Sequence, residues 1–274
     1  MDFLFFQVAM KYIESRNNQT VKNTVLLKDR RARKESGRFI FEGVHLLEEY
    51  LRFGHKPAML FVREDALSRH EGLIASADCE TVVVSESVYE KLTEEKAPQG
   101  ILTVSDFLDN VVFCSSECEE LAETEGNSLL LVDLQDNGNV GTVIRTAASL
   151  GCDPVLCGSC ADIYSPKTIR ATMGALFSSR VYICASPENA VKALQKGQKR
   201  VLATALTENA EVLGGFDILP TDAFVIGNEG RGLSSELIAL CDKTVIIPMS
   251  GKTESLNAAS AASIILWEAK RGRL

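Results

Sequence analysis

The second half of the chain repeats one pattern: a short, continuous run of apolar residues followed by a segment with the periodicity of an amphipathic helix. Continuous apolarity, in place of strict alternation, indicates strands that are buried on both faces. Such strands are typical of parallel sheets with helices on either side, so we expect an α/β domain of that kind. Its strand-like runs are SLLLVDL, PVLCG, RVYICA, RVLATAL, AFVIG and TVIIPM.

The first half is predicted to form a smaller α/β module. Between residues 38 and 107, the strand-like runs RFIFEG, AMLFVRE, CETVVV and GILTVSDF alternate with helical segments. Residues 115–127 are acidic and carry no periodic pattern, as is typical of a linker. We therefore expect an N-terminal α/β domain over 1–114, a linker over 115–127 and the parallel-sheet domain over 128–274.

Composition narrows the class of protein. With 46% apolar and 24% charged residues, the 274-residue chain has an ordinary globular composition, and its net charge of −8 gives no global sign of nucleic-acid binding. The eight cysteines, CGSC included, show no disulfide framework, which suits a reducing cytoplasm, and no Cys/His set has metal-ligand spacing. We therefore expect no bound metal. We also expect no membrane partner, since no stretch reaches the ~20 apolar residues that span a membrane.

One segment departs from the acidic average. Between residues 22 and 38, seven basic residues stand against two acidic ones. Such a strip is typical of a surface that contacts RNA phosphates, although the solvated face of a helix has the same composition. The candidate RNA contacts are Lys28, Arg30, Arg31, Arg33, Lys34 and Arg38.

Three polar loops follow strand-like runs of the second half, at the end of the strands where parallel sheets bind ligands. Their candidate residues are Asn139 and Arg145 in DLQDNGNVGTVIRTA, Glu229 in FVIGNEGRGL, and Ser255 and Asn257 in IPMSGKTESLNAAS. Asn139, Ser255 and Asn257 serve equally well as helix caps. Arg145 falls among apolar neighbours and is expected to be buried against a dedicated partner, and Glu229 is expected to be buried among glycines.

Two nucleotide-binding motifs are incomplete in these loops. The stretch 251–253 ends like a P-loop, but Ile246 replaces the first glycine and Pro248 removes an N–H donor. A dinucleotide fingerprint needs G-x-G-x-x-G, and Gly138 and Gly141 give only half of it. A P-loop hydrolase and a dinucleotide-dependent oxidoreductase are therefore disfavoured. The polar loops, which contain no histidine, suit the positioning of a ribose hydroxyl near a phosphate, with a cofactor supplying the reactivity.

In this order, NVGTVIRTA, IGNEGRGL and IPMSGKTESLNAASA resemble the three motifs of the SpoU/TrmH family of RNA 2′-O-ribose methyltransferases, in the SPOUT superfamily. The resemblance covers about residues 128–274, and YSPKTIRATMGALF (164–177) is similar to the family's pattern between the first two motifs. The N-terminal module, with SGRFIFEGVHLLEEYL, resembles the substrate-binding domain of rRNA-modifying members. The resemblance implies a SPOUT domain with a trefoil knot, which general topology rules disfavour, a homodimer, and S-adenosylmethionine as cofactor.

The resemblance also implies roles for individual residues. Arg145 would act on the 2′-hydroxyl, with Asn139, Glu229, Ser255 and Asn257 completing the catalytic site. Since a guanidinium has a pKa above ~12 and is a poor base, we favour Arg145 gripping the adjacent phosphate and orienting the hydroxyl. The expected cofactor contacts are Thr204, Ala205, Gly227, Ile247, Met249 and Leu256.

The activity implied is S-adenosylmethionine-dependent methylation of a ribose 2′-hydroxyl in RNA. The N-terminal module favours ribosomal RNA, and 23S rRNA in particular, as the substrate. The alternatives are methylation of tRNA and a non-catalytic RNA-binding factor for ribosome assembly on the same scaffold. Binding of the cofactor would discriminate the last of these from an enzyme.

Overall fold

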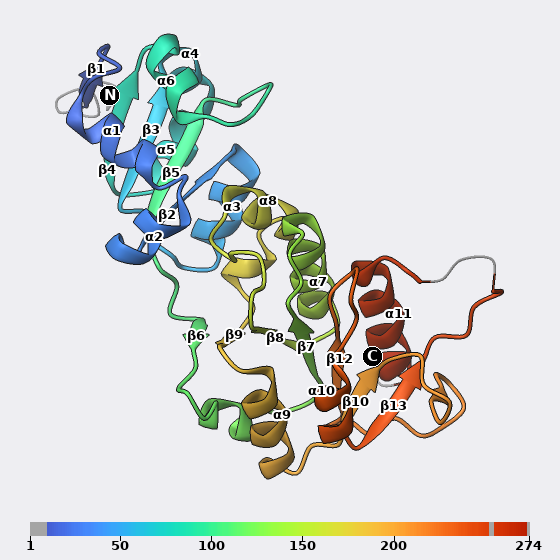
Figure 1. Cartoon of the computed structure of the whole chain (residues 1–274). Coiled ribbons are helices and arrows are strands. Elements are labelled where there is room, and N and C mark those ends of the chain that lie inside the picture. The colour runs from blue at the N-terminus through green and yellow to red at the C-terminus, as the bar shows by residue number, and fades with distance from the viewer. Residues whose placement is uncertain (1–9, 252–254, 273–274) are drawn as a thin grey trace. The chain divides into compact units, whose positions relative to one another are not determined.

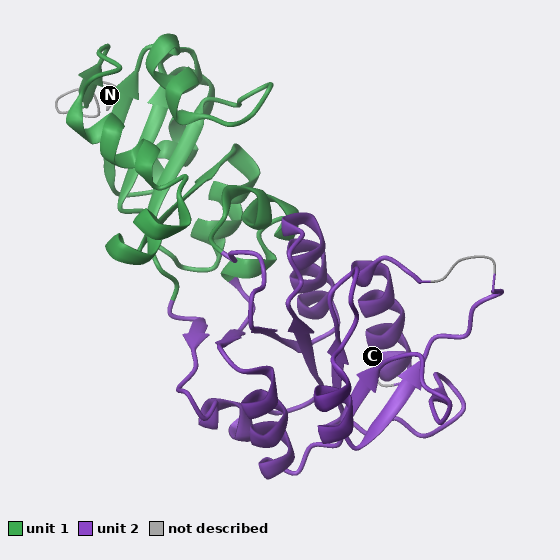
Figure 2. Ribbon diagram, in the orientation of Figure 1, with its two compact units in different colours: residues 1–108, 164–177 green, residues 109–163, 178–274 purple. Residues whose placement is uncertain are grey.

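The structure is a computed structural model and describes residues 10–251 and 255–272. Lys252 and Thr253, which complete the P-loop-like stretch, lie outside the described residues. The chain divides into two compact units (Figure 2). Unit 1 comprises residues 1–108 and 164–177, and unit 2 comprises residues 109–163 and 178–274.

Unit 2 is built on an eight-stranded sheet of order β11-β13-β10-β12-β7-β8-β9-β6, in which all neighbours pair in parallel. This confirms the predicted parallel sheet, and the middle strand β7 is buried at every residue. The short edge strands β6 and β11 were not predicted. The strands are β6 (Val111–Phe113), β7 (Ser128–Val132), β8 (Asp153–Cys157), β9 (Val181–Cys184), β10 (Val201–Thr204), β11 (Glu211–Val212), β12 (Ala223–Ile226) and β13 (Lys243–Ile246).

The helices of unit 2 cover this sheet. They are η2 (Glu119–Glu123), α7 (Asn137–Ser149), α9 (Pro187–Lys196), α10 (Ser235–Leu240) and α11 (Ala258–Lys270). The short helix η2 lies in the stretch that we expected to be a linker. Cys118 and Leu121 of this stretch are fully buried in the same apolar core as Leu194 of α9, so the stretch packs as part of unit 2.

The strand order reverses at β7. The next strands along the chain, β8 and β9, extend the sheet on one side, whereas β12 lies on the other side, between β7 and β10 (Figure 1). Because the sheet is parallel, the carboxyl ends of β7, β12, β10 and β13 follow one another along the same edge. The loops that leave these ends converge there, as ligand-binding loops do at such switch points.

Unit 1 is built on a mixed five-stranded sheet of order β1-β4-β3-β5-β2, in which β5 runs antiparallel to β3 and β2. Its strands are β1 (Lys11–Ile13), β2 (Arg38–Glu42), β3 (Met59–Arg63), β4 (Glu80–Val84) and β5 (Ile101–Asp106). Its helices are α1 (Gln19–Leu26), α2 (Arg30–Ser36), α3 (Val44–Arg52), α4 (Glu64–Leu67), η1 (Ser68–His70), α5 (Glu71–Ser76), α6 (Glu86–Leu92), α8 (Pro166–Thr172) and η3 (Ala175–Phe177).

Residues 164–177 pack into unit 1 although their neighbours in sequence belong to unit 2. The ring of Tyr164 stacks on Phe107 with centroids 4.1 Å apart and lies 4.8 Å from the ring of Phe39. Phe177, at the other end of the segment, lies 5.1 Å from Phe41. Aromatic packing at both ends therefore fixes a segment whose sequence we had placed in the C-terminal domain.

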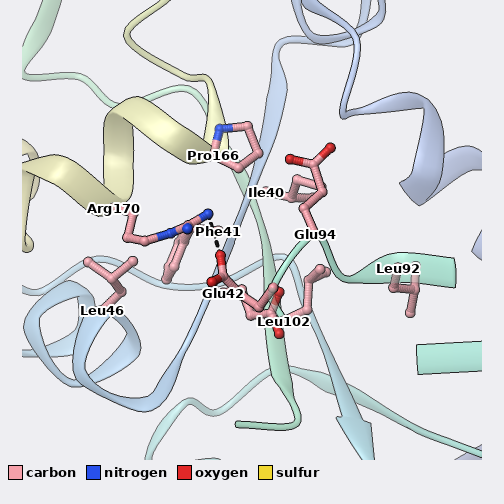
Figure 3. Close-up of a pocket in the computed structure, with 10 residues that line it drawn as sticks. Ile40, Phe41, Glu42, Leu46, Leu92, Glu94, Leu102, Pro166 and Arg170 are labelled. Atoms are coloured by element: carbon pink, nitrogen blue, oxygen red, sulfur yellow. Dashed lines mark ion pairs between the residues drawn. The ribbon is translucent and has the colours of Figure 1, made fainter. Parts of the chain in front are cut away.

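Between these ends, α8 helps to line a small pocket of unit 1. Pro166 and Arg170 lie beside β2 and β5, and Arg170 forms an ion pair with Glu95 (Figure 3). Glu42 of β2 faces the same pocket and accepts hydrogen bonds from the hydroxyls of Tyr89 at 3.0 Å and Thr93 at 2.6 Å. Burial raises the pKa of the Glu42 carboxyl, and the two hydrogen bonds oppose this rise only in part.

Candidate active site

A cavity of about 550 Å³ opens at the carboxyl ends of β10, β12 and β13, within the size range of small-molecule sites. Its lining combines backbone of a glycine-rich loop with apolar side chains open to solvent, among them Leu206, which is 72% exposed. The residues that we predicted to contact a cofactor all line it: Thr204, Ala205, Gly227, Ile247, Met249 and Leu256. The fold thus brings three distant loops to one cavity.

The loop after β12 folds back on itself at Gly227. Gly232 donates its N–H to the carbonyl of Asn228 at 2.9 Å, with a φ of 65° at Gly232. A Cβ on Gly227 would overlap the carbonyl group of Gly232 and lie 2.7 Å from the nitrogen of Leu233. Only glycine permits this approach, and it leaves bare backbone at the cavity wall.

Three polar side chains, one from each loop, form a hydrogen-bonded chain. Asn139 donates from Nδ2 to Oε1 of Glu229 at 3.1 Å, and Asn257 donates from Nδ2 to Oδ1 of Asn139 at 3.0 Å. Because a carboxylate only accepts, Asn139 must turn its amide nitrogen to Glu229 and its oxygen to Asn257. The expected burial of Glu229 is wrong: its side chain stands exposed at the tip of the loop and lines the cavity.

Helix capping assigns the polar residues differently from our expectation. The N-cap of α7 is Asp136, whose carboxylate accepts from the N–H of Asn139 at 2.7 Å, so the Asn139 side chain is not a cap. Asn257 does cap α11 through Oδ1, while its Nδ2 reaches Asn139. Ser255 is exposed and lines the cavity. Asn257 thus combines a structural and a site contact.

The expectation that Arg145 is buried against a dedicated partner is wrong. Arg145 is exposed, whereas Val143, Ile144 and Ala147 of the same helix are buried. Its guanidinium makes no hydrogen bond or ion pair with the described residues, and it is not among those that line the cavity. It lies six residues after Asn139, about 9 Å further along α7, so the structure does not join it to the polar chain.

The basic strip of unit 1 is divided by the fold. Arg33 is 3% exposed and donates to the carbonyls of Leu27 and Lys28 at 2.8 Å, so its selection as an RNA contact is corrected. Lys28 is half-buried and donates to two carbonyls at 3.1 Å, and burial lowers the pKa of its amine. Both side chains hold the backbone of unit 1. The exposed members of the strip are Arg30, Arg31, Lys34 and Arg38, of which Arg31 pairs with Glu35 at 2.7 Å and Arg38 with Asp106 at 2.8 Å.

A groove of about 640 Å³ lies beside these cations in unit 1. Asn23 and Thr20 of α1 and Ser36 of α2 give it polar edges, and Met59 and Leu26 give it an apolar surface, with Leu26 59% exposed. Arg38 lines its rim. No sequence pattern indicates this groove, because its walls come from α1, α2 and strands that are distant in the chain.

Sequence reasoning also missed Arg231, which is exposed and lines the cavity of unit 2 two residues after Glu229. Its place in the same glycine-rich loop was the available signal.

Over residues 10–251 and 255–272, no helix is long and apolar enough to cross a membrane. In the same residues, no cluster of His, Cys, Asp and Glu is disposed to hold a metal ion. All eight cysteines are free thiols.

Comparison with known proteins gives two family matches. The model of the SpoU rRNA Methylase family matches residues 126–267, which include the cavity and all three polar loops. The model of the MRM3-like substrate binding domain matches residues 18–103, which include the basic strip and most of the groove.

Individual proteins are similar over nearly the full chain. The 23S rRNA (guanosine(2553)-2′-O)-methyltransferase RlmP of Bacillus subtilis is 34% identical over 266 residues, covering 94% of this chain and 98% of that protein. The 23S rRNA (uridine(2479)-2′-O)-methyltransferase of Streptomyces viridochromogenes is 30% identical, covering 97% of this chain and 94% of that protein. An AdoMet-bound rRNA methyltransferase from Sinorhizobium meliloti gives a TM-score of 0.83 at 27% identity, covering 97% of this chain and 99% of that one.

Proposed function

Since the chain belongs to the SpoU rRNA methylase family, as its three loop motifs predicted, we propose that it transfers a methyl group from S-adenosylmethionine to a ribose 2′-hydroxyl of ribosomal RNA. The observation that carries this proposal is the cavity at the ends of β10, β12 and β13, together with the hydrogen-bonded chain Glu229–Asn139–Asn257, whose Glu229 lines the cavity. The names of the similar proteins support the large-subunit, 23S rRNA as the substrate.

The cavity fits the cofactor. Backbone at Gly227, Ile247 and Leu256, with Thr204, Ala205 and Met249, would hold the adenosyl group, because bare backbone offers hydrogen bonds and apolar side chains offer a surface for a ring. When bound, S-adenosylmethionine supplies an electrophilic methyl on a sulfonium. The protein's task is therefore to place a hydroxyl oxygen in line with that methyl and to stabilise the charges that develop.

Arg145 is suited to hold RNA. A guanidinium exposed to solvent and without a partner in the described chain is available for a phosphate, which it grips in bidentate fashion. Holding the phosphate next to the target ribose orients the 2′-hydroxyl, and proton loss follows late in the transfer. Glu229, Asn139, Asn257 and Ser255 complete the site by hydrogen bonding, with the carboxylate able to accept from a hydroxyl.

Unit 1 selects the RNA. Arg30, Arg31, Lys34 and Arg38 would contact phosphates, and the groove beside them would take unpaired nucleotides, which RNA-binding proteins recognise more readily than paired ones. The match to a substrate binding domain over residues 18–103 supports this role.

The active protein is a homodimer with a knotted catalytic domain. Ile264 and Trp267 on α11 are 40% and 55% exposed, and exposed apolar residues on one helix suit a face covered by a second copy. The position of β12 between two strands that precede it supports a trefoil knot of the C-terminal segment. Eight free thiols and an rRNA substrate support a place in the reducing cytoplasm.

Radiolabelled S-adenosylmethionine and unmodified total RNA, separated by size after reaction, test the proposal. Label in one rRNA band, mapped to a ribose 2′-oxygen, is the expected result. Label in the tRNA band would keep the reaction and overturn the substrate. Absence of label from in vitro transcripts of rRNA, precursor rRNA and assembled subunits alike, despite measurable cofactor binding, would contradict an enzymatic role.

A further inference from the structure

Asp133, directly after β7, has a backbone conformation that residues other than glycine adopt infrequently, although Asp and Asn adopt it more often than most. Its φ is 53°, in the left-handed region, where a residue with a side chain is strained unless its surroundings hold it. Two contacts hold it: its N–H donates to the carbonyl of Cys157 at 3.1 Å, and its Oδ1 accepts from the N–H of Ser159 at 2.6 Å. The loop after β8 therefore fixes the residue that leaves β7.

Gly158 makes this arrangement possible. A Cβ on Gly158 would overlap Oδ1 of Asp133, and its own φ is 69°. Glycine satisfies both conditions at once, because it has no Cβ and adopts positive φ readily. The glycine of the CGSC stretch is thus explained by its contact with Asp133, without any redox role for the flanking thiols.

The carbonyl of Asp133 accepts a hydrogen bond from the loop after β12. Asn228 donates from Nδ2 to this carbonyl at 2.8 Å, and its Oδ1 accepts from the N–H groups of Gly230 at 2.9 Å and Arg231 at 3.2 Å. The two ends of one amide therefore face different loops. The nitrogen anchors Asn228 to the end of β7, and the oxygen shapes the turn that follows.

Glu229 stands inside that turn, between the anchored Asn228 and Gly230, whose N–H the same amide holds. Its carboxylate accepts from Asn139 at 3.1 Å, and Asn139 lies in the first turn of α7, the helix that follows β7. Asp133 and Asn139 both belong to the segment that leads from β7 into α7. The bond from Asn228 to Asp133 therefore holds the next residue, Glu229, near Asn139.

Resting on the proposed function, we propose that Asn228 is a positioning residue for methyl transfer, which fixes the Glu229 carboxylate relative to Asn139 by bonding the strained Asp133. Asn228 also lines the cavity, but this role requires no contact of Asn228 or Asp133 with substrate or cofactor. Asn228→Asp is the sharp test, because a carboxylate keeps both accepting bonds within the turn and replaces the donation to Asp133 by a repulsion between two oxygens.

The kinetic arm compares Asn228→Asp with the wild-type protein. A small displacement of a site group costs about 10²-fold, so we expect kcat to fall by about ten- to hundredfold, with KM for S-adenosylmethionine within about threefold. Gly158→Ala, which pushes on Asp133 from the other side, should lower kcat in the same way. Ser159→Ala is the matched control, since Ser159 contacts Asp133 only through its backbone N–H, and its activity should equal that of the wild type.

The spectroscopic arm needs no catalysis. The side-chain amide resonances of Asn139, in protein labelled with ¹⁵N-asparagine, report its bond to Glu229, and Glu229→Ala marks their position when that bond is lost. Asn228→Asp should move them toward the Glu229→Ala position, and Ser159→Ala should leave them in place. Unmoved resonances in Asn228→Asp, or equal losses of kcat and cofactor affinity, would overturn the positioning role. If the resonances move but the wild-type protein methylates no RNA, the contact between Asn228 and Asp133 still positions Glu229, and only the proposed reaction is overturned.

Discussion

The candidate functional residues of the two units are marked in the sequence in different ways. In unit 2, three short motifs separated by many residues meet at one edge of a parallel sheet, and the predicted cofactor contacts line one cavity there. In unit 1, a run of basic residues marks a surface, but the fold turns Arg33 inward and half-buries Lys28. Strand ends and glycines fix where a loop residue lies, whereas composition alone does not say which side of a helix faces water.

Arg145 is the exception in unit 2, since its motif was recognised but the expectation that it is buried was wrong. Arg145→Ala should lower the single-turnover rate of methyl transfer by at least about 10²- to 10³-fold, because the proposed phosphate clamp is lost. Its exposed position away from the cavity predicts a nearly unchanged dissociation constant for S-adenosylmethionine, measured by calorimetry. Arg145→Lys keeps the charge without the bidentate guanidinium, so its single-turnover rate should lie between those of the wild type and Arg145→Ala. Parallel loss of rate and cofactor affinity would show that Arg145 supports the fold instead.

Gly227 tests whether the bare backbone of unit 2 is what binds the cofactor. Gly227→Ala forces a methyl group into the Gly232 carbonyl, and overpacking of this kind costs about 1–3 kcal/mol. If the strain falls on the cavity wall, affinity for S-adenosylmethionine drops about five- to 150-fold in calorimetry. Gly230→Ala is the matched control in the same loop, because its Cβ would meet its nearest neighbour, Oδ1 of Asn228, at 3.7 Å. Equal affinities for the two variants would remove the Gly227 wall from the cofactor site.

The basic strip is tested by separating its exposed from its buried members. Replacing both Arg30 and Lys34 by Gln should weaken RNA binding and lower the slope of log K against log salt by about one to two, as two phosphate contacts are lost. Filter binding at several salt concentrations measures this. Arg33→Gln should instead lower the free energy of unfolding by about 1–3 kcal/mol, since it removes donors from two carbonyls, and should leave the salt slope unchanged. The reverse pattern would place Arg33 at the RNA.

Local patterns predicted the parallel sheet and six of its strands, and the resemblance to the methyltransferase family supplied the six expected cofactor contacts that line the cavity. The hydrogen bond from Asn228 to the Asp133 carbonyl was not predicted, since neither a positive φ nor a contact to a backbone carbonyl can be read from residue type. Arg145 shows a subtler limit. It follows buried Ile144 in sequence, but successive residues of a helix point about 100° apart, so the buried face runs through Val140, Val143, Ile144 and Ala147 and leaves Arg145 outside.

Glu42 carries the smallest predicted effect and contrasts an interior charge of unit 1 with its surface cations. Burial raises the pKa of this carboxyl in the folded state, so the folded protein holds the proton more tightly than the unfolded chain does. Its contribution to stability is complete below the ordinary carboxyl pKa of ~4.3 and is lost as pH rises through the raised value. Glu42→Gln removes this titration and keeps an oxygen for Tyr89 or Thr93. Denaturant unfolding from pH 4 to pH 7 should therefore show the wild type losing stability relative to Glu42→Gln. A constant difference over that range would mean that hydrogen bonds from the two hydroxyls fully offset the cost of burial, and that unit 1 tolerates an interior carboxylate as easily as it displays its surface arginines.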